Sequence, residues 1–219
     1  MNKIEDILKQ DEFTRDDIIK LLSIESYDEV EILRHYANDT LNKHIGDKIF
    51  LRGIIEFSNI CCCNCYYCGI RAGNKHVKRF RLSQEEIVEL AKAAAEEGFG
   101  SLVLQSGEVN EAEFVEFVAN TVKKIKSYTK SEKLPEGMGI TLSIGEQSYE
   151  SYKKLFEAGA HRYLLRIETS NENLFNQIHP PSQKLSSRVE KLGFLRDIGY
   201  QVGTGVMIGI PGQTIEDLA

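Results

Sequence analysis

The sequence predicts an α/β protein with a TIM-barrel-like parallel sheet, about five strands of a (β/α)8 barrel, behind an N-terminal helical segment. Two observations predict this fold. Short apolar runs alternate with helical stretches and no hairpin signals separate them, which indicates parallel strands joined by crossover helices. Each apolar run also ends in a polar or glycine-containing group, and functional groups gather at the carboxyl ends of strands in such sheets.

The composition is that of a globular chain. It has 219 residues, of which 42% are hydrophobic, enough to bury one substantial core. The net charge is −6 with acids and bases mixed, so no basic surface for nucleic acid is predicted. No apolar run approaches the ~20 residues of a membrane span, and no apolar signal segment opens the chain. We therefore expect a cytoplasmic protein that binds neither nucleic acid nor membrane.

Residues 1–50 are predicted to form an N-terminal helical cap, and residues 51–219 the barrel-like domain. Two stretches resemble capping boxes that open helices, one at Thr14 and one at Ser26. Apolar residues follow each of them at helical spacing. This pattern favours a cover over a core rather than a partner-binding arm.

The strands and helices of the barrel-like domain follow in order. Strands are expected over Ile54–Phe57, Ser101–Leu104, Gly139–Leu142, Arg162–Leu165 and Gln201–Ile208. Helices are expected between them: one capped by Ser83 and continuing to Glu97, one from near Asn110, one ending at Ala158, and one capped by Ser187 and ending before Gly199.

The last residues, from Thr214 to Ala219, resemble a capped helix that has barely begun. Five strands do not close an eight-stranded barrel, and a helix cut in its first turn would leave a sheet edge uncovered. We therefore expect the chain to be truncated at its C-terminus. A short terminal turn on a complete half-barrel is the alternative.

All five cysteines lie between Cys61 and Cys68. Thiolates crowded in this way are typical ligands of one soft metal centre. Two registers are open, because either Cys61 or Cys62 can join Cys65 and Cys68. Both registers supply three thiolates and leave one coordination position free, which is typical of a catalytic metal site.

Three other interpretations of the cysteines remain. A structural zinc could take His76 as its fourth ligand, but zinc sites usually carry a second ligand pair some distance away. A disulfide cluster would need an oxidising compartment. A redox dithiol is the third possibility. The ligand count and spacing favour an iron–sulfur cluster.

The register Cys61, Cys65 and Cys68, with the aromatic Tyr67 just before the last cysteine, resembles the signature of the radical S-adenosylmethionine superfamily. The resemblance implies a 4Fe–4S cluster bound by these three cysteines. It also implies that the amino and carboxylate groups of S-adenosylmethionine chelate the fourth iron. Cys62 and Cys63 have no place in that pattern.

Ser106, Gly107 and Glu108 follow the second predicted strand. Glycine lets a backbone approach a ligand closely, and a glutamate accepts a hydrogen bond from an ammonium group. The resemblance implies that this turn contacts the methionyl amino group of the cofactor. Tyr67 is expected to stack on the adenine or hydrogen-bond to it, and a packing role is the alternative.

Arg166 ends the fourth predicted strand, where its guanidinium suits a carboxylate. The alternative is an ion pair with Glu168 or Glu146. Glu146 is expected to hold the ribose or the sulfonium of the cofactor, or to orient Arg166. Met207 lies in a glycine-containing turn that suits an adenine ring, although methionine is also an ordinary core residue.

The resemblance narrows to the FeFe-hydrogenase maturases of the HydE type, with biotin synthase and methylornithine synthase as relatives. It is carried by Ile55–Asn59, Cys68–Arg71, Val103–Glu108, Arg162–Thr169 and Gly209–Thr214. It implies reductive cleavage of S-adenosylmethionine to a 5′-deoxyadenosyl radical. It further implies a small-molecule or small iron-complex substrate, an electron donor such as ferredoxin or flavodoxin, and other hydrogenase maturases as partners.

Two further functions stay open from the sequence. One is a biotin synthase-like or methylornithine synthase-like radical enzyme on the same scaffold. The other is a non-catalytic iron–sulfur or zinc-binding protein.

Overall fold

The computed structural model describes residues 4–219. The chain divides into two compact units. Residues 51–207 form the larger unit, and residues 4–50 form the smaller unit together with Ile208–Ala219. The predicted functional residues all belong to the larger unit.

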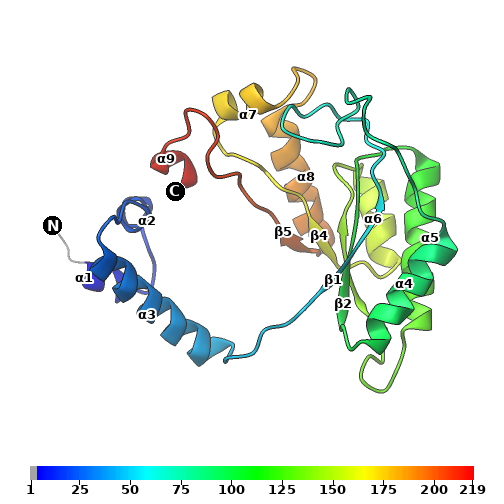
Figure 1. The fold of residues 1–219 in the computed structure, drawn as a ribbon, viewed down its shortest axis with the longest axis horizontal. Coiled ribbons are helices and arrows are strands. Elements are labelled where there is room, and N and C mark those ends of the chain that lie inside the picture. The colour runs from blue at the N-terminus through cyan, green and yellow to red at the C-terminus, as the bar shows by residue number, and fades with distance from the viewer. Residues whose placement is uncertain (1–3) are drawn as a thin grey trace. The chain divides into compact units, whose positions relative to one another are not determined.

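The larger unit is built on a five-stranded sheet (Figure 1). Its strands are β1 (Gly53–Ser58), β2 (Ser101–Ser106), β3 (Gly139–Ser143), β4 (Arg162–Leu164) and β5 (Gln201–Gly203). They lie side by side in chain order and every neighbouring pair is parallel. The predicted parallel α/β sheet is therefore confirmed. The fifth strand ends at Gly203 rather than Ile208, because the chain beyond it pairs irregularly with the residues after β4.

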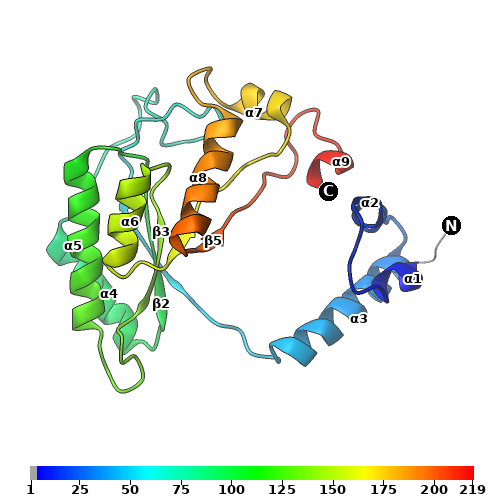
Figure 2. The same ribbon diagram turned by 180° about the vertical axis from the view of Figure 1, so that it is seen from behind.

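Crossover helices join the strands. They are α4 (Gln84–Glu96), α5 (Ala112–Tyr128), α6 (Tyr149–Glu157), α7 (Glu172–Ile178) and α8 (Leu185–Ile198). Figures 1 and 2 show α4, α5, α6 and α8 on one face of the sheet. Ser83 caps α4 with the expected capping box, and Gly199 ends α8 in the left-handed conformation.

Two details of the helices differ from the sequence prediction. Helix α8 begins at Leu185, so Ser187 lies inside it and its hydroxyl donates to Glu146 instead of capping the helix. Helix α7 was not predicted. It is short, and the Asn171 side chain caps it by accepting from the N–H groups of Asn173 and Leu174.

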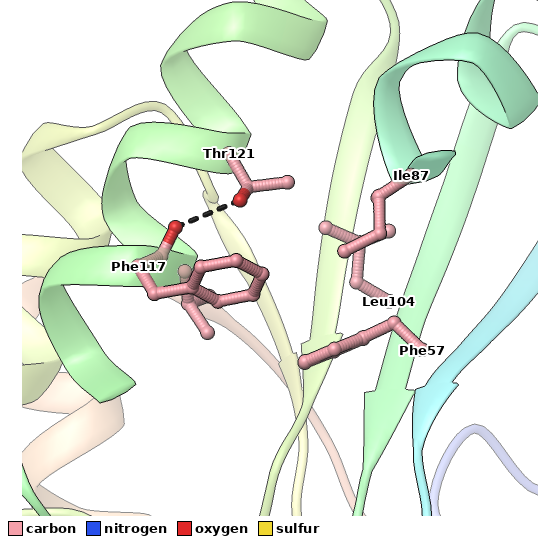
Figure 3. Close-up of a pocket in the computed structure, with 6 residues that line it drawn as sticks. Phe57, Ile87, Leu104, Phe117 and Thr121 are labelled. Carbon is pink, nitrogen blue, oxygen red and sulfur yellow. Dashed lines mark hydrogen bonds between the residues drawn. The ribbon is translucent and has the colours of Figure 1, made fainter. Parts of the chain in front are cut away.

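The core lies between the sheet and these helices. Figure 3 shows one part of it, where Phe57, Leu104 and Ile87 approach Phe117 and Thr121. The space left between them is too small for a water molecule. The Thr121 hydroxyl donates to the Phe117 carbonyl at 2.7 Å, so this polar group is satisfied inside its own helix. This packing fixes the strands whose carboxyl ends carry the site.

The smaller unit contains α1 (Ile4–Leu8), α2 (Arg15–Leu22), α3 (Tyr27–His44) and α9 (Ile215–Leu218). The predicted capping box at Thr14 is present. Ser26 stands at the N-cap of α3, but its side chain makes no capping hydrogen bond. Arg15 donates to the Glu216 carbonyl at 2.7 Å and so ties α2 to α9. Within residues 4–219, every helix is too short or too polar to cross a membrane.

Candidate metal and cofactor site

A cleft of about 200 Å³ lies at the carboxyl ends of the strands. Its walls come from the loop after β1, from the ends of β2, β3 and β4, and from the segment that leads into α8. The predicted residues that line it are Cys61, Cys65, Tyr67, Cys68, Ser106, Gly107, Glu108, Arg166 and Glu168. Glu146 and Met207 do not line it. The structure thus brings residues from five separate segments to one cleft.

The loop after β1, which carries the cysteines, is held by a side chain that the sequence prediction did not single out. Arg79 donates to the carbonyl oxygens of Asn59, Ile70 and Arg71 at 2.6–2.7 Å. These acceptors lie before and after the cysteines. A guanidinium carries five donors in a fixed plane, so one arginine can close such a loop. No local sequence pattern marks Arg79, because all its partners are backbone carbonyls.

The three thiols of the register Cys61, Cys65 and Cys68 all face the cleft. Cys62 is exposed and does not line it. Three thiols that line one cleft fit a soft metal centre that keeps a position open toward a ligand. His76, the fourth ligand of the zinc alternative, is exposed and outside the cleft lining. The donor set therefore fits a three-thiolate cluster.

Gly107 sets the distance between the cysteine loop and the end of β2. A Cβ atom at this position would lie 2.6 Å from Cys61 Cβ and would overlap the Ile60 carbonyl oxygen. Any larger residue must therefore push the loop away. The sequence predicted that Gly107 lets the backbone approach a ligand, and in the structure it lets the backbone approach the cysteine loop.

The Glu108 carboxylate is fixed at the cleft by two partners. Its Oε2 accepts from the Glu146 N–H at 2.7 Å, and its Oε1 accepts from the Cys63 thiol at 3.1 Å. Gly145 makes room for it, because a Cβ there would overlap the Glu108 side chain. Gly145 also has a φ of +80°, which glycine adopts without strain. A positioned carboxylate of this kind can accept a hydrogen bond from a ligand ammonium.

Cys61 and Cys63 interact with each other. The hydrogen bond from Cys63 lowers the pKa of Cys61 to about 6. The same hydrogen bond, burial and the nearby Glu108 carboxylate raise the pKa of Cys63. Cys61 is therefore the more acidic thiol of the pair.

Glu146 pairs with Arg188, a residue that the sequence prediction did not assign to the site. Arg188 Nε donates to Glu146 Oε1 at 2.6 Å, and its Nη1 donates to the Arg166 carbonyl at 2.6 Å. Both side chains are largely buried, with exposed fractions of 8% and 17%. Arg188 lines the cleft while Glu146 stands behind it. Glu146 therefore orients Arg188 rather than Arg166.

Arg166 is exposed and lines the cleft. Among residues 4–219, no carboxylate comes within ion-pair distance of it, so the alternative pairs with Glu168 and Glu146 do not form. Its guanidinium can therefore meet the carboxylate of a ligand in the cleft.

Glu168 has an unusual backbone conformation. Its φ is +65°, which strains a residue with a side chain, and the residue is buried with an exposed fraction of 8%. Burial raises the pKa of its carboxyl group, while a hydrogen bond with the Tyr67 hydroxyl lowers it in part. Strained residues of this kind gather at functional sites.

Tyr67 is held from behind by His179. The two rings meet edge to face at 5.5 Å, and the Tyr67 hydroxyl lies 3.5 Å from His179 Nε2. His179 is buried against Phe175, which brings the unpredicted helix α7 into contact with the cysteine loop. The Tyr66 N–H also donates to the Ile178 carbonyl at 2.9 Å. The end of α7 therefore positions the cysteine loop.

Comparison with known proteins gives concordant results. A family model described as the Radical SAM superfamily matches residues 55–219. The FeFe hydrogenase maturase subunit HydE of Thermotoga maritima is 43% identical over 211 residues, covering 96% of this chain and 58% of that protein. Biotin synthase of Staphylococcus aureus is 29% identical, covering 100% of this chain and 63% of that protein.

A solved structure gives the same result for the fold. The crystal structure of methylornithine synthase superposes with a TM-score of 0.82 at 28% identity, covering 98% of this chain and 61% of that chain. The five parallel strands and their helices are thus the TIM-barrel-like arrangement of these enzymes. The chain spans 58% to 63% of the length of these three matches.

Proposed function

The chain belongs to the radical S-adenosylmethionine superfamily, and we propose that it cleaves S-adenosylmethionine reductively to methionine and a 5′-deoxyadenosyl radical. Members of this superfamily use a 4Fe–4S cluster and S-adenosylmethionine. The observation that carries the proposal is a single cleft lined by the thiols of Cys61, Cys65 and Cys68, the fixed Glu108 carboxylate and the Arg166 guanidinium, which has no ion-pair partner among the described residues. The cluster would supply the electron, and the protein would bind and orient the cofactor.

Cys61, Cys65 and Cys68 would hold the cluster and leave one iron open to the cofactor. Glu108 would accept hydrogen bonds from the cofactor's amino group, next to Ser106 and Gly107. Both of its oxygen atoms already lie at fixed positions. A carboxylate fixed before the ligand arrives loses little freedom on binding, which favours affinity.

The other wall of the cleft would hold the rest of the cofactor. Arg166 and Arg188 carry the positive charges there, and Arg166 would meet the methionyl carboxylate. Glu146 would act behind the cleft by holding Arg188. Tyr67 and Glu168 would contact the adenosine part, and Met207, which lies outside the lining, would support the turn that follows Glu168.

The substrate proposal follows from the relatives. Identity of 43% to the HydE maturase subunit, against 29% to biotin synthase, supports a role in the maturation of FeFe hydrogenase. The substrate would be a small molecule or a small iron complex used to build the dithiolate-bridged di-iron subcluster. Ferredoxin or flavodoxin would donate the electron, and other maturases would be partners. All five cysteines are free thiols, which fits a reducing cytoplasmic location.

The test is anaerobic reconstitution of the chain with iron and sulfide, followed by dithionite and S-adenosylmethionine. The products 5′-deoxyadenosine and methionine are quantified by mass spectrometry. Cys65→Ala should lower their formation by more than about 100-fold, because losing even an outer partner of a metal ligand costs 10–100-fold. Cys62→Ala is the matched control and should retain activity. A colourless zinc-containing protein, or equal loss in both variants, would contradict the proposal.

A further inference from the structure

A fourth thiol shares the cleft with the three predicted ligands. Cys63 lines the same cleft as Cys61, Cys65 and Cys68, whereas Cys62 between them is exposed and does not. Cys61, Cys63 and Cys65 are each half-buried in this loop, whereas Cys62 and Asn64 between them are exposed. The superfamily pattern accounts for three of these thiols and leaves Cys63 without a role.

Cys63 also forms a hydrogen bond with the Glu108 carboxylate, the group proposed to bind the amino group of the cofactor. Its Sγ lies 3.1 Å from Oε1 of Glu108. The loop holds it there, because the Ala72 N–H donates to the Cys63 carbonyl at 2.8 Å and the Gly73 N–H donates to the side chain of Asn64 at 3.0 Å. A cofactor amino group that approaches Glu108 therefore meets Cys63.

We propose that Cys63 is a built-in cap: its thiolate binds the open iron of the cluster while S-adenosylmethionine is absent, and the cofactor displaces it. This inference rests on the proposed function. Thiolate sulfur is a ligand that iron–sulfur clusters prefer. A fourth thiolate would close the position through which an oxidant can remove iron. The cap would thus protect the resting cluster until its cofactor binds.

The exchange balances without any change in oxidation state. The bond between iron and Cys63 sulfur breaks, and bonds from iron to the amino nitrogen and the carboxylate oxygen of the cofactor form. An ammonium must lose one proton before its nitrogen can bind iron, and the departing Cys63 thiolate takes that proton. The resulting thiol then donates to Glu108, as it does in the structure.

The direct test maps thiols in the reconstituted wild-type chain. Iodoacetamide is applied anaerobically with and without S-adenosylmethionine, and peptide mass spectrometry scores each cysteine. Cys63 should be alkylated several times faster with the cofactor than without it, because iron no longer covers its sulfur, whereas Cys62 should be alkylated at the same rate in both samples. Equal alkylation of Cys63 in both samples overturns the cap. If Cys61, Cys65 and Cys68 react as fast as Cys62, the cluster itself is absent and the proposed function fails as well.

Binding gives a second measurement. A cap closed in nine tenths of the molecules raises the apparent Kd for the cofactor about tenfold, because only the open fraction binds. Cys63→Ala should therefore lower the Kd in equilibrium dialysis by about that factor, and Cys63→Ser, a poorer iron ligand, should lie between. Cys62→Ala is the control, since the Cys62, Cys63 and Glu108 ligand atoms lie within 4.8 Å of one another. A Kd unchanged by Cys63→Ala, or lowered equally by Cys62→Ala, overturns the cap.

Discussion

Glu168 lines the cleft in a backbone conformation that lowers the stability of the folded protein. Its left-handed φ of +65° destabilises the folded state, whereas glycine adopts this conformation without strain. Burial also raises the pKa of the Glu168 carboxyl group. The chain after β5 fixes this conformation, because the Glu168 N–H donates to the Gly205 carbonyl and the Met207 N–H donates to the Glu168 carbonyl. The strain therefore persists in the folded protein.

Replacing Glu168 with glycine should separate stability from function. Glu168→Gly should raise the free energy of unfolding by about 1 kcal/mol, the usual cost of one strained residue, while cofactor cleavage falls. Glu168→Gln keeps the strained backbone and should show no such gain. Chemical denaturation of all three proteins measures the difference. A glycine variant less stable than the glutamine variant would contradict this account.

The ion pair between Arg188 and Glu146 could not be predicted from the sequence. The sequence placed Glu146 near Arg166, since both follow predicted strands. It interpreted the stretch from Ser187 to Glu190 as a helix cap. The partner that forms is 42 residues away, and the packing of α8 against α6 and β5 brings it there. A long-range pair between buried charges leaves no local pattern in a sequence.

At the scale of elements, the contact between the end of β2 and the cysteine loop decides the geometry of the site. Gly107 permits that contact, because a side chain would overlap Ile60 and Cys61. The N–H of Cys62 then donates to the Glu108 carbonyl at 2.9 Å. The Gly107 N–H also donates to the Ser58 carbonyl at 3.3 Å, so backbone hydrogen bonds join the two segments at the glycine and at the residue after it.

Gly107→Ala should displace the cysteine loop while the sheet stays folded. Overpacking of this kind typically costs 1–3 kcal/mol, here about 2 kcal/mol, and the loop is the part that can yield. We expect less iron per chain after reconstitution and weaker cofactor binding. Gly100→Ala is the control, since a Cβ there meets no atom within 4 Å. Iron content equal to that of the wild type in Gly107→Ala would show that the contact does not matter.

The elements themselves were largely predictable. Strands and helices with strong apolar periodicity, such as β2 and α4, appear within a few residues of their expected bounds. Helix α7 was not predicted because it is short and its buried residues are only Leu174 and Phe175, too few to give a helical pattern. That omission hid His179, whose ring supports Tyr67. Short elements contribute little periodicity, so tertiary contacts decide them.

At the scale of the whole molecule, the sheet brings distant segments to one place. The cysteines, Glu108, Arg166 and Glu168 come from loops after three different strands and meet because parallel strands end at the same edge. This convergence was predictable from the sequence, since each apolar run ended in a polar group. The supporting contacts of Arg79 and Arg188 were not, because they depend on the path of the loops.

The most direct measurement is electron paramagnetic resonance of the anaerobically reconstituted, dithionite-reduced chain with and without S-adenosylmethionine. A cluster held by Cys61, Cys65 and Cys68, with an iron that accepts the cofactor, should give a reduced 4Fe–4S signal that shifts when the cofactor is added. A signal that the cofactor leaves unchanged, or a protein that takes up no iron, would contradict the account.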